Sequence, residues 1–577
     1  MQKRQVPYAR SNFEEVITGK YYYIDKTQYI ENLEKFKTPV FLRPRRFGKS
    51  LFAEMLKWYY DIRAEDRFNE LFGHLYIGQH PTPARNSYFF LKFDFSGMGV
   101  WSESDKNIIK RQFDNKIHTY LESFLIYYKS NLHLDDEDIN EFNRYYRNDS
   151  TGALKKVIDI VARNRGKIFL AIDEYDSLTN ALAIHYQYAP EKDNEYLNVL
   201  RKGGFFRGFF ETIKEGLGSS LDRVYITGIL PITIADMNSG FNVAEWVSFE
   251  PELINMLGVT ESEFIRLLNE IYDENDISVP KQKVRQAVKQ YYNGYRFSPD
   301  SEYVYNPMMT LFYLKSLIHN NRIPDDFTDS NIRIDYNQIA FLFGNNYKKR
   351  DEVIEKISRD KQVIFSSKLN VCFDMTDYKN GNYIIEGLFY SGILTFSDDI
   401  IVLKIPNLVT YERALSYFER TRNFEIEKKD FGKWIFEYLR KGNVEYLIEG
   451  FFTEVIQMFP GDFFSNVNES FYHGLLFHLI YTNTRKDIYE VLPEFGLPDG
   501  KADIMVCSYP KSTTSLQVTD LFEIKRVPKS ATDKNFSAKF EEGKQQMQLY
   551  RQGRYKNWRG IVVCFRGNKD YRIEVLK

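Results

Sequence analysis

The sequence has 577 residues, which is more than one hydrophobic core normally organises, so we expect two to four domains. Apolar residues make up 43% of the chain and charged residues 27%, as in soluble globular proteins. Because 78 Lys and Arg are balanced by 79 Asp and Glu, the chain as a whole has no field that would attract a nucleic acid or a membrane.

The cysteines and the apolar runs indicate a compartment. Cys372, Cys507 and Cys564 show neither metal-ligand spacing nor a disulfide framework, which suits a reducing cytoplasm. The start, MQKRQVPYAR, is charged and no apolar segment follows it, so we expect no secretory signal. No run of about 18 or more apolar residues occurs. The sequence therefore predicts a soluble cytoplasmic protein with no membrane partner.

Residues 1 to about 245 alternate short apolar runs with longer amphipathic stretches, as βαβ units do. The apolar runs are bounded by charges or by Gly and Pro, so they predict buried parallel strands. The amphipathic stretches between them predict helices. The predicted strands are 38–44, 88–95, 167–173 and 223–229, and the predicted helices include 50–62 and 105–128.

The segment RPRRFGKS (43–50) follows the apolar run VFL and opens a predicted helix. Gly48, Lys49 and Ser50 end a P-loop pattern, in which N–H groups wrap phosphates, the lysine reaches the β- and γ-phosphates, and the serine binds Mg²⁺. Arg43 stands where the usual pattern has its first glycine. Arg45 and Arg46 either contact phosphate or act as fingers on a neighbouring subunit. We expect the nucleotide to contact Arg43, Arg45, Arg46, Phe47, Gly48, Lys49 and Ser50.

A second element completes this site. The run KIFLAIDEYD (167–176) is an apolar strand that ends in Asp173 and Glu174. A carboxylate at a strand tip holds Mg²⁺, and the next one polarises the attacking water. The alternative is that these acids cap a helix. The two elements together predict an ATP·Mg²⁺ site, with Asp173 as a metal ligand beside Ser50 and Glu174 as the catalytic residue. Thr227, at the end of a further strand, either senses the γ-phosphate or caps a helix.

The chain from about 250 to 410 is mostly helical in pattern, with helices expected at 260–274 and 283–295. Strand-like pieces are expected at 382–396 and 400–407. From about 411 a helical run precedes two apolar segments, a polar helix and a last strand. Those four elements are expected at 501–508, 519–526, around Gln545 and Gln546, and at 560–565.

The two apolar segments carry Asp503 and the pair Glu523 and Lys525. Because side chains alternate along a strand, Glu523 and Lys525 share one face, and a hairpin would bring Asp503 to them. Such a cluster binds Mg²⁺ or Mn²⁺ and sets a water for attack on a phosphodiester, with the lysine stabilising charge. Glu469, on a preceding helix, adds a third carboxylate. The alternative is a row of exposed charges on an edge strand.

The last residues are basic: 511–577 hold 15 Lys and Arg against 7 Asp and Glu, an excess of eight. A local basic surface binds a polyanion even in a neutral protein, although a solvated face has the same composition.

Six motifs are spread along the chain: YYYIDKTQYI (21–30), FLRPRRFGKS (41–50), LAIDEYD (170–176), YNGYRF (292–297), YNP (305–307) and YSGILT (390–395). With them the sequence resembles the bacterial and archaeal AAA-ATPase-like family over roughly residues 5–570. The resemblance implies that an arginine at position 43 is usual for the loop and that Asp25, Lys26 and Thr27 lie near the nucleotide. From the residues alone, DKT would cap a helix. The resemblance also implies a C-terminal PD-(D/E)XK nuclease-like domain, whose core the αββαβ order matches.

We therefore predict an α/β protein with three domains. They are a P-loop ATPase domain with a parallel sheet (1–245), a mainly helical, winged-helix-like middle or lid domain (246–410) and a restriction-endonuclease-like domain (411–577). The predicted function is ATP hydrolysis that controls a metal-dependent nuclease acting on DNA or RNA, with ATP and Mg²⁺, or Mn²⁺ at the second site. The alternatives are a switch ATPase whose C-terminal domain binds without cleaving, and a structural protein with a vestigial loop. Analogy with other P-loop ATPases suggests a homo-oligomer.

Overall fold

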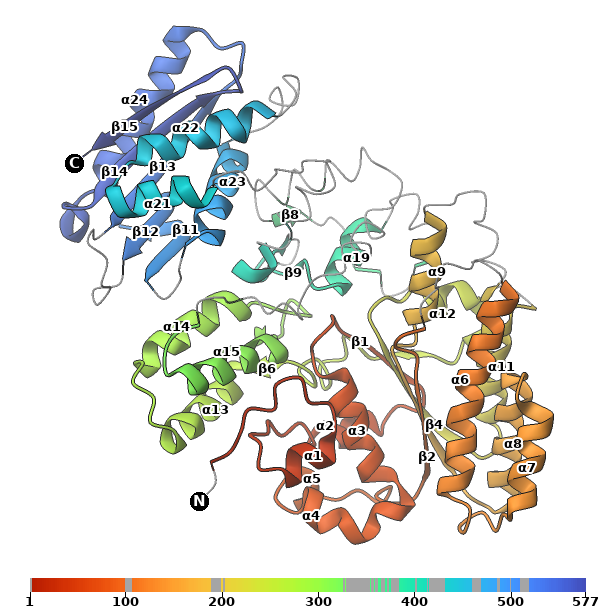
Figure 1. The fold of residues 1–577 in the computed structure, drawn as a ribbon. Helices are drawn as coiled ribbons and strands as arrows, with labels where there is room; N and C mark the ends of the chain where they lie inside the picture. The colour runs from red at the N-terminus through yellow and green to blue at the C-terminus, as the bar shows by residue number, and fades with distance from the viewer. Residues whose placement is uncertain are drawn as a thin grey trace. The chain divides into compact units, whose positions relative to one another are not determined.

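The structure, a computed structural model, describes most of the chain in two compact units. The first lies mainly within residues 1–407 and the second mainly within residues 408–577 (Figure 1). Cys372 lies outside the described residues. Those residues are 3–98, 106–187, 199–200, 203–324, 383–399, 402–411, 431–458, 469–484, 488–498, 500–508 and 518–576, with 327, 353, 357, 362–364, 369–370, 373–374 and 414.

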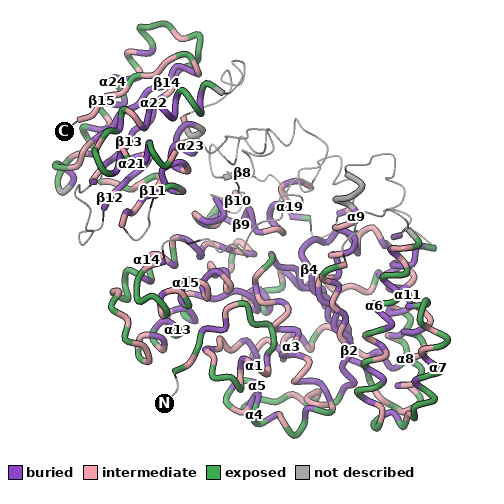
Figure 2. Tube along the Cα trace, in the orientation of Figure 1, coloured by how far each residue is buried: buried purple, intermediate pink, exposed green. Residues whose placement is uncertain are grey.

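A five-stranded parallel sheet forms the centre of the first unit. Its order is β2-β3-β4-β1-β5, and β3 is buried at every residue, as Figure 2 shows for the sheet. This confirms the predicted α/β unit with a parallel sheet, because strands covered on both faces are continuous apolar runs. The strands are β1 (Pro39–Leu42), β2 (Phe89–Asp94), β3 (Ile168–Asp173), β4 (Leu221–Gly228) and β5 (Glu245–Trp246).

Helices pack against this sheet, among them α3 (Lys49–Tyr60) and α6 (Lys106–Tyr127). In α8, the buried side chains of Ala153, Leu154, Val157 and Val161 recur at helical spacing. The helix predicted at 105–128 forms as α6. The helical elements are α1 (Phe13–Thr18), α2 (Tyr29–Leu33), α3 (Lys49–Tyr60), η1 (Ile62–Arg67), α4 (Phe68–Phe72), α5 (Tyr76–Gln79), α6 (Lys106–Tyr127), α7 (Asp136–Tyr146), α8 (Ser150–Arg163), α9 (Ser177–Gln187), α11 (Phe205–Gly216), α12 (Ile232–Met237) and η3 (Asn238–Phe241).

The segment after the sheet is mainly helical, as predicted. Helix α13 begins with a capping box, in which Thr260 and Glu263 satisfy each other's main-chain N–H groups. The strand prediction for 382–396 is wrong over most of its length, because 384–390 is a helix buried at all but one residue. The elements are β6 (Val259–Thr260), α13 (Glu261–Glu274), α14 (Lys281–Tyr292), β7 (Val304–Tyr305), α15 (Pro307–Asn320), β8 (Gln362–Ile364), α19 (Ile384–Tyr390), β9 (Thr395–Phe396) and β10 (Val402–Lys404).

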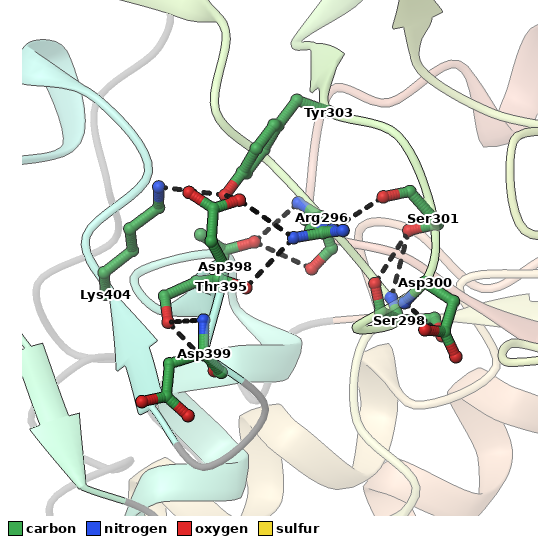
Figure 3. Close-up of polar contacts among 10 residues, drawn as sticks. Arg296, Ser298, Asp300, Ser301, Tyr303, Thr395, Asp398, Asp399 and Lys404 are labelled. Carbon is green, nitrogen blue, oxygen red and sulfur yellow. Dashed lines mark hydrogen bonds and ion pairs between the residues drawn. The ribbon is translucent and has the colours of Figure 1, made fainter.

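A polar cluster ties the segment 295–303 to the β9–β10 hairpin (Figure 3). The main-chain N–H of Arg296 donates to the Thr395 hydroxyl at 2.6 Å, and the Arg296 guanidinium donates to the Asp398 carboxylate at 3.1 Å. The Tyr303 hydroxyl donates to Asp398 at 2.8 Å and accepts from Lys404 at 3.0 Å. These contacts fix a strip of chain whose aromatic rings face the loop that follows β1.

The second unit has a mixed five-stranded sheet of order β11-β12-β13-β14-β15, in which only β13 and β14 are parallel. The predicted αββαβ order is incomplete. A strand, β11, precedes the predicted pair, and β15 follows the strand predicted to be last. The elements are α21 (Phe431–Lys441), α22 (Val444–Glu454), η5 (Ile456–Met458), α23 (Glu469–Thr482), β11 (Tyr489–Leu497), β12 (Gly500–Ser508), β13 (Thr519–Val527), α24 (Asp533–Tyr550), η7 (Gly553–Tyr555), β14 (Arg559–Arg566) and β15 (Asp570–Leu576).

Helix α24 packs against β13 and β14 over a core that includes Leu521, Phe536, Met547 and Val562. The packing is close at Gly543, where a Cβ atom would come within 2.9 Å of the Lys525 side chain. Among the helices that the structure describes, none combines the length and the apolar character needed to cross a bilayer.

Candidate functional site

The loop between β1 and α3 is shaped by Gly48. Its φ of 94° lies in the left-handed region, which a residue with a Cβ rarely adopts. Gly48 is also the N-cap of α3, so no cap side chain occupies the N–H groups of the first turn. Those N–H groups and the helix dipole together favour an anion at this end. The local chain thus has the form that the GKS motif predicts.

Lys49 is buried, with a relative exposure of 6%. Its ammonium group donates to the main-chain carbonyls of Arg43 and Pro44, each at 3.0 Å, so the side chain lies across the loop. Burial lowers the pKa of Lys49, whereas the carboxylates of Asp173 and Glu174 act to raise it. A buried ammonium held by uncharged oxygens leaves this loop electropositive.

Asp173 ends β3 and is 1% exposed. Ser50 lies close enough to influence this carboxylate, whose Oδ1 atom has no hydrogen-bond partner within the described part of the chain. Burial raises the pKa of Asp173, against the effects of Ser50 and Lys49. Lys49, Ser50 and Asp173 therefore meet at the carboxyl edge of the sheet. Hydroxyl and carboxylate oxygens are the ligands that Mg²⁺ prefers, so these residues fit the predicted ion.

Glu174 and Arg46 both have left-handed backbones, with φ of 52° and 73°. Such strain in residues other than glycine clusters at functional sites. Burial raises the pKa of Glu174, which the nearby Lys49 acts to lower. Burial lowers the pKa of Arg46, and the Glu174 carboxylate opposes that shift, so the two charges lie close together. Arg45, by contrast, is exposed.

Thr227 lies within β4, where it pairs with Phe41 of β1 and is fully buried. Its hydroxyl has no hydrogen-bond partner among the described residues. The alternative that Thr227 caps a helix is wrong, because it belongs to a strand. Asp94, which the sequence analysis missed, pairs with Asp173 in the strand register. The signal was present, since β2 is also an apolar run that ends in Asp.

The guanidinium of Arg43 is directed away from the loop interior. It donates to the carbonyls of Leu42, Ser248 and Ile254 at 2.8 to 2.9 Å, and it lies between the rings of Phe41 and Phe297. Burial lowers the pKa of Arg43 to about 9. The predicted phosphate contact by this side chain is therefore corrected. Within the loop, the main-chain carbonyl of Arg43 accepts from Lys49. The Arg43 side chain links the loop to Ser248 and Ile254.

A largely apolar cavity of about 100 Å³ lies beside Gly48. Phe47, on its wall, makes edge contacts with Tyr295 and Phe297 at centroid distances of 5.0 and 5.4 Å. Lys26 lines the cavity and forms a buried ion pair with Glu263 at 2.8 Å. The other lining residues are Pro7, Tyr22, Tyr23, Ile24, Gly48, Leu51, Phe52, Met256, Leu257, Gly258, Val259, Leu267, Pro307 and Leu311.

Asp25 and Thr27 do not line this cavity. The Asp25 carboxylate accepts from the main-chain N–H groups of Thr27 and Tyr76, at 2.8 and 2.7 Å. It closes a turn before α2 and accounts for its own charge there, so the expected nucleotide contact by Asp25 is corrected. The helix-cap interpretation of DKT is also wrong, because the N-cap of α2 is Gln28.

In the second unit, β12 and β13 pair from Ile504 to Cys507 and separate at Asp503. There the Asp503 carboxylate accepts from the main-chain N–H of Ile524 at 2.6 Å, in place of a strand-to-strand bond. Glu523 and Lys525 lie on one face of β13, as predicted, with their side chains 2.8 Å apart. The structure thus brings Asp503, Glu523 and Lys525 together.

Glu469 begins α23 and lies at the edge of this cluster. Its carboxylate is 3.7 Å from Lys525 and 3.5 Å from Lys539, which also donates to Glu542. His473 approaches Asp503 at 4.0 Å. The Glu523 Oε2 atom is buried without a hydrogen-bond partner in the described residues, as is the Oε1 atom of Gln546.

Burial and the neighbouring Glu523 carboxylate raise the pKa of Asp503 to about 8. Burial also raises the pKa of Glu523, which Lys525 acts to lower. Burial lowers the pKa of Lys525, but Glu523 and Glu469 outweigh this and the net shift is upward. Within the described residues, no group of three His, Cys, Asp or Glu is arranged to hold a metal ion. In this arrangement Lys525 is paired with Glu523, the carboxylate that would have to act with Asp503 to bind a metal ion.

Three basic side chains of 511–577 form ion pairs with acids of the same segment. Arg559 donates to Asp520 at 2.6 Å, and Arg566 pairs with Asp533 at 2.5 Å. Lys544 lies 3.0 Å from Glu574. These acids are already subtracted in the excess of eight, so the excess comes from the other basic residues.

Comparison with known proteins bears on the first unit. Residues 7–238 match the AAA-ATPase-like family model, described as Predicted AAA-ATPase. This AAA-ATPase-like segment contains the GKS loop, the Asp173–Glu174 tip and Thr227, and it confirms that part of the resemblance. No curated protein and no solved structure matched the chain. The nuclease-like domain stays a prediction from motif and fold order.

Proposed function

We propose that the first unit binds ATP with Mg²⁺ and hydrolyses it. The proposal rests on one observation: Ser50, at the start of α3, lies beside the Asp173 carboxylate at the tip of β3, next to the buried ammonium of Lys49. A cation, a hydroxyl and a carboxylate at a helix N-terminus match the charges of a metal-bound triphosphate.

Each residue then has a distinct role. Magnesium, when bound with the triphosphate, supplies charge neutralisation at the phosphate oxygens. Ser50 and Asp173 would hold that ion, and Lys49 would turn from the loop carbonyls to the β- and γ-phosphates. Glu174 would orient the attacking water. Burial favours the neutral form of its carboxyl group, whereas the nearby Lys49 favours the charged form. Thr227 would face the γ-phosphate.

The apolar cavity supports a nucleotide as the ligand instead of a simple phosphate. It adjoins Gly48, and its lining is almost entirely carbon, with Lys26 as its charged member. A planar base buries apolar surface there while its phosphates reach the loop. Phe47 would contact the base through the wall that it shares with Tyr295 and Phe297.

The test is ATP affinity by calorimetry. Lys49→Ala should weaken binding at least about hundredfold, because it removes a buried charge from the phosphate. Lys57→Ala, on the same helix but 40% exposed, is the matched control and should bind normally. Glu174→Gln should bind ATP and release no phosphate. Wild-type protein that binds neither ATP nor ADP would contradict the proposal.

For the second unit we propose a metal-dependent site that cleaves nucleic-acid phosphodiesters under control of the nucleotide. Support comes from the convergence of Asp503, Glu523 and Lys525 where β12 and β13 separate, and from the buried, unpartnered Glu523 Oε2. Binding of Mg²⁺ or Mn²⁺ would require Lys525 to leave Glu523, and Glu469 would then complete the oxygen ligands. Lys525 would stabilise the charge that develops on phosphate.

Cleavage assays on labelled DNA and RNA, with Mn²⁺ and with ATP, ADP or neither, test this. Asp503→Ala and Lys525→Ala should lose cleavage and keep ATP hydrolysis. Lys534→Ala, exposed at the start of α24, is the control. If wild-type protein cuts neither polymer in any nucleotide state but binds one tightly, the second candidate holds: a switch ATPase whose C-terminal unit binds without cleaving.

Assembly is part of the proposal. Arg45 is exposed beside the loop, so in a homo-oligomer it would be available to a neighbouring subunit as a finger. Arg45→Ala should then lower ATP turnover in proportion to the assembled fraction, and a monomer with full turnover would remove this role.

A further inference from the structure

Asp176 lies three residues beyond the tip of β3 and belongs to none of the roles above. It is 2% exposed, and its Oδ2 atom accepts three hydrogen bonds. Two come from the main-chain N–H groups of Ile229 and Leu230, at 3.1 and 2.8 Å, and one from the Asn180 side chain at 2.9 Å. One carboxylate oxygen therefore binds the turn that leaves β4 to the segment that leaves β3.

Neighbouring contacts reinforce the same junction. The main-chain N–H of Tyr175 donates to the Thr227 carbonyl at 3.1 Å, and the Tyr175 hydroxyl donates to the Leu230 carbonyl. Gly228 lies directly against both side chains, since a Cβ there would come within 2.5 Å of the Tyr175 ring and 2.6 Å of Asp176 Oδ1. The ends of β3 and β4 are thus fixed to each other at several points.

This junction sets the distance between two proposed active groups. Glu174 immediately precedes Tyr175, and Thr227 immediately precedes Gly228. Glu174 also has a strained, left-handed backbone, which persists only where the surroundings hold it. The Asp176 charge reaches the site as well, because it acts to raise the pKa values of both Lys49 and Glu174.

We propose that Asp176 is a positioning residue for hydrolysis: it holds Glu174 on β3 and Thr227 on β4 at the spacing that orients the attacking water. Its Oδ2 atom accepts three hydrogen bonds and the side chain is shielded from solvent, so its role here is to hold the two strand ends together. The inference rests on the proposed ATPase function and makes a narrower claim, that losing this contact impairs turnover and spares nucleotide binding.

The experiment measures kcat, KM and ATP dissociation constants for Asp176→Ala and Asp176→Asn in the full chain. Asp176→Ala should lower kcat at least about tenfold and change ATP affinity less than about threefold. Asp176→Asn should restore kcat to within about threefold of wild type, since an amide oxygen accepts the same main-chain N–H groups.

Asp61 provides a matched control. It is also 2% exposed, it accepts from the Arg63 N–H and from the hydroxyls of Tyr127 and Tyr128, and it lies beside Tyr88 at the amino end of β2, away from the site. Asp61→Ala should lower the melting temperature about as much as Asp176→Ala and leave kcat unchanged.

Gly228→Ala carries the test if Asp176→Ala does not fold, because the added methyl group pushes Tyr175 and Asp176 from the turn. It should show the same loss of kcat with ATP binding retained. Unchanged kcat in Asp176→Ala or Gly228→Ala, an equal loss in Asp61→Ala, or an Asn variant as slow as the Ala variant would each overturn the inference. Wild-type protein that binds no ATP, or binds it without turnover, would instead refute the ATPase proposal and this inference with it.

Discussion

In the first unit, the buried cations Arg43 and Lys49 donate to uncharged main-chain carbonyls, whereas in the second the buried Lys525 donates to the Glu523 carboxylate. Among the described residues, the hydrogen bonds of the first arrangement place no carboxylate on either cation. In the second, three carboxyl groups, those of Glu523, Asp503 and Glu469, adjoin one lysine. Since a buried charge attracts its opposite more strongly than an exposed one, the first site is suited to a polyanion and the second to a cation.

The two sites also differ in how far their side chains must rearrange before a ligand can bind. At the first site, Ser50, Asp173 and Lys49 already lie together, and only the lysine must change partners. At the second, Lys525 must leave Glu523 before the carboxylates can share an ion. The ATP site is therefore expected to need less reorganisation than the metal site in the second unit.

The largest effect expected is on stability, from Arg43→Met. The change leaves the carbonyls of Leu42, Ser248 and Ile254 without their donor, so we expect a loss of about 3 kcal/mol in the free energy of unfolding. Arg45→Met, at an exposed position, should change stability by less than about 0.5 kcal/mol. Scanning calorimetry measures the stability of both variants, on the thermal transition whose midpoint shifts when ATP is added. Equal stability of the two variants would show that carbonyl groups do not hold the Arg43 charge.

Glu523→Gln tests the cation site. It removes one negative charge and a ligand oxygen, so Mn²⁺ should bind about ten- to hundredfold more weakly to the second unit. Titration calorimetry with Mn²⁺ gives the affinity. Glu541→Gln, exposed on α24 and 3.0 Å from Lys544, is the matched control and should bind Mn²⁺ as the wild type does. Unchanged affinity in Glu523→Gln would remove the contrast between the two units.

Ser50→Ala tests the anion site at its metal ligand. Without the hydroxyl beside Asp173, ATP affinity in the presence of Mg²⁺ should fall about tenfold, or about 1.4 kcal/mol. In excess EDTA, the variant and the wild type should bind ATP equally. Fluorescence titration with a labelled ATP in both buffers separates these outcomes, and an equal loss in both would mean that Ser50 acts on the phosphates alone.

The smallest effect expected is a pH dependence of the second unit. The pKa of Asp503 is raised to about 8 in the folded protein, above its unfolded value of about 3.9, so its protonated form favours folding. Stability is full below the unfolded pKa and falls as pH rises toward the folded one. Between pH 5 and pH 8, an interval that lies between these two pKa values, we expect the melting temperature to fall. Asp503→Asn should flatten this slope, and Mn²⁺ at the higher pH should offset it only in the wild type.

Sequence patterns predicted the parts of the fold that are buried on both faces. The strands β1 to β4 are apolar runs, and each was found within a few residues of its bounds. The edge strands were missed for a physical reason. β5 has only two residues, and β11 contains Pro493, Gly496 and half-exposed side chains, so no apolar run marks it. The helix at 384–390 was mistaken for strand because it is apolar on nearly every side, which hides the helical period.

The candidate sites were predicted through motifs whose residues contact one another locally or across neighbouring strands. Lys49, Ser50 and Asp173 meet, as do Asp503, Glu523 and Lys525. The directions of Arg43 and Asp25 were not predictable, because a sequence gives a charge and not the partner that accepts it. No role was predicted for Asp176, because its partners, Ile229 and Leu230, are apolar residues. They bind its carboxylate through their main-chain N–H groups, which a sequence pattern does not mark.

The cavity beside Gly48 sets a minimum length for any autonomous piece of this protein. The segment with family resemblance stops at residue 238, yet Met256, Gly258, Pro307 and Leu311 belong to the cavity wall, and Ser248 and Ile254 accept from Arg43. A recombinant fragment that ends at residue 238 would expose that wall to water. It would also leave the Arg43 guanidinium without two of its hydrogen-bond acceptors. The folding unit is therefore longer than the segment that matches the family model, and truncations of this chain should begin downstream of Leu311.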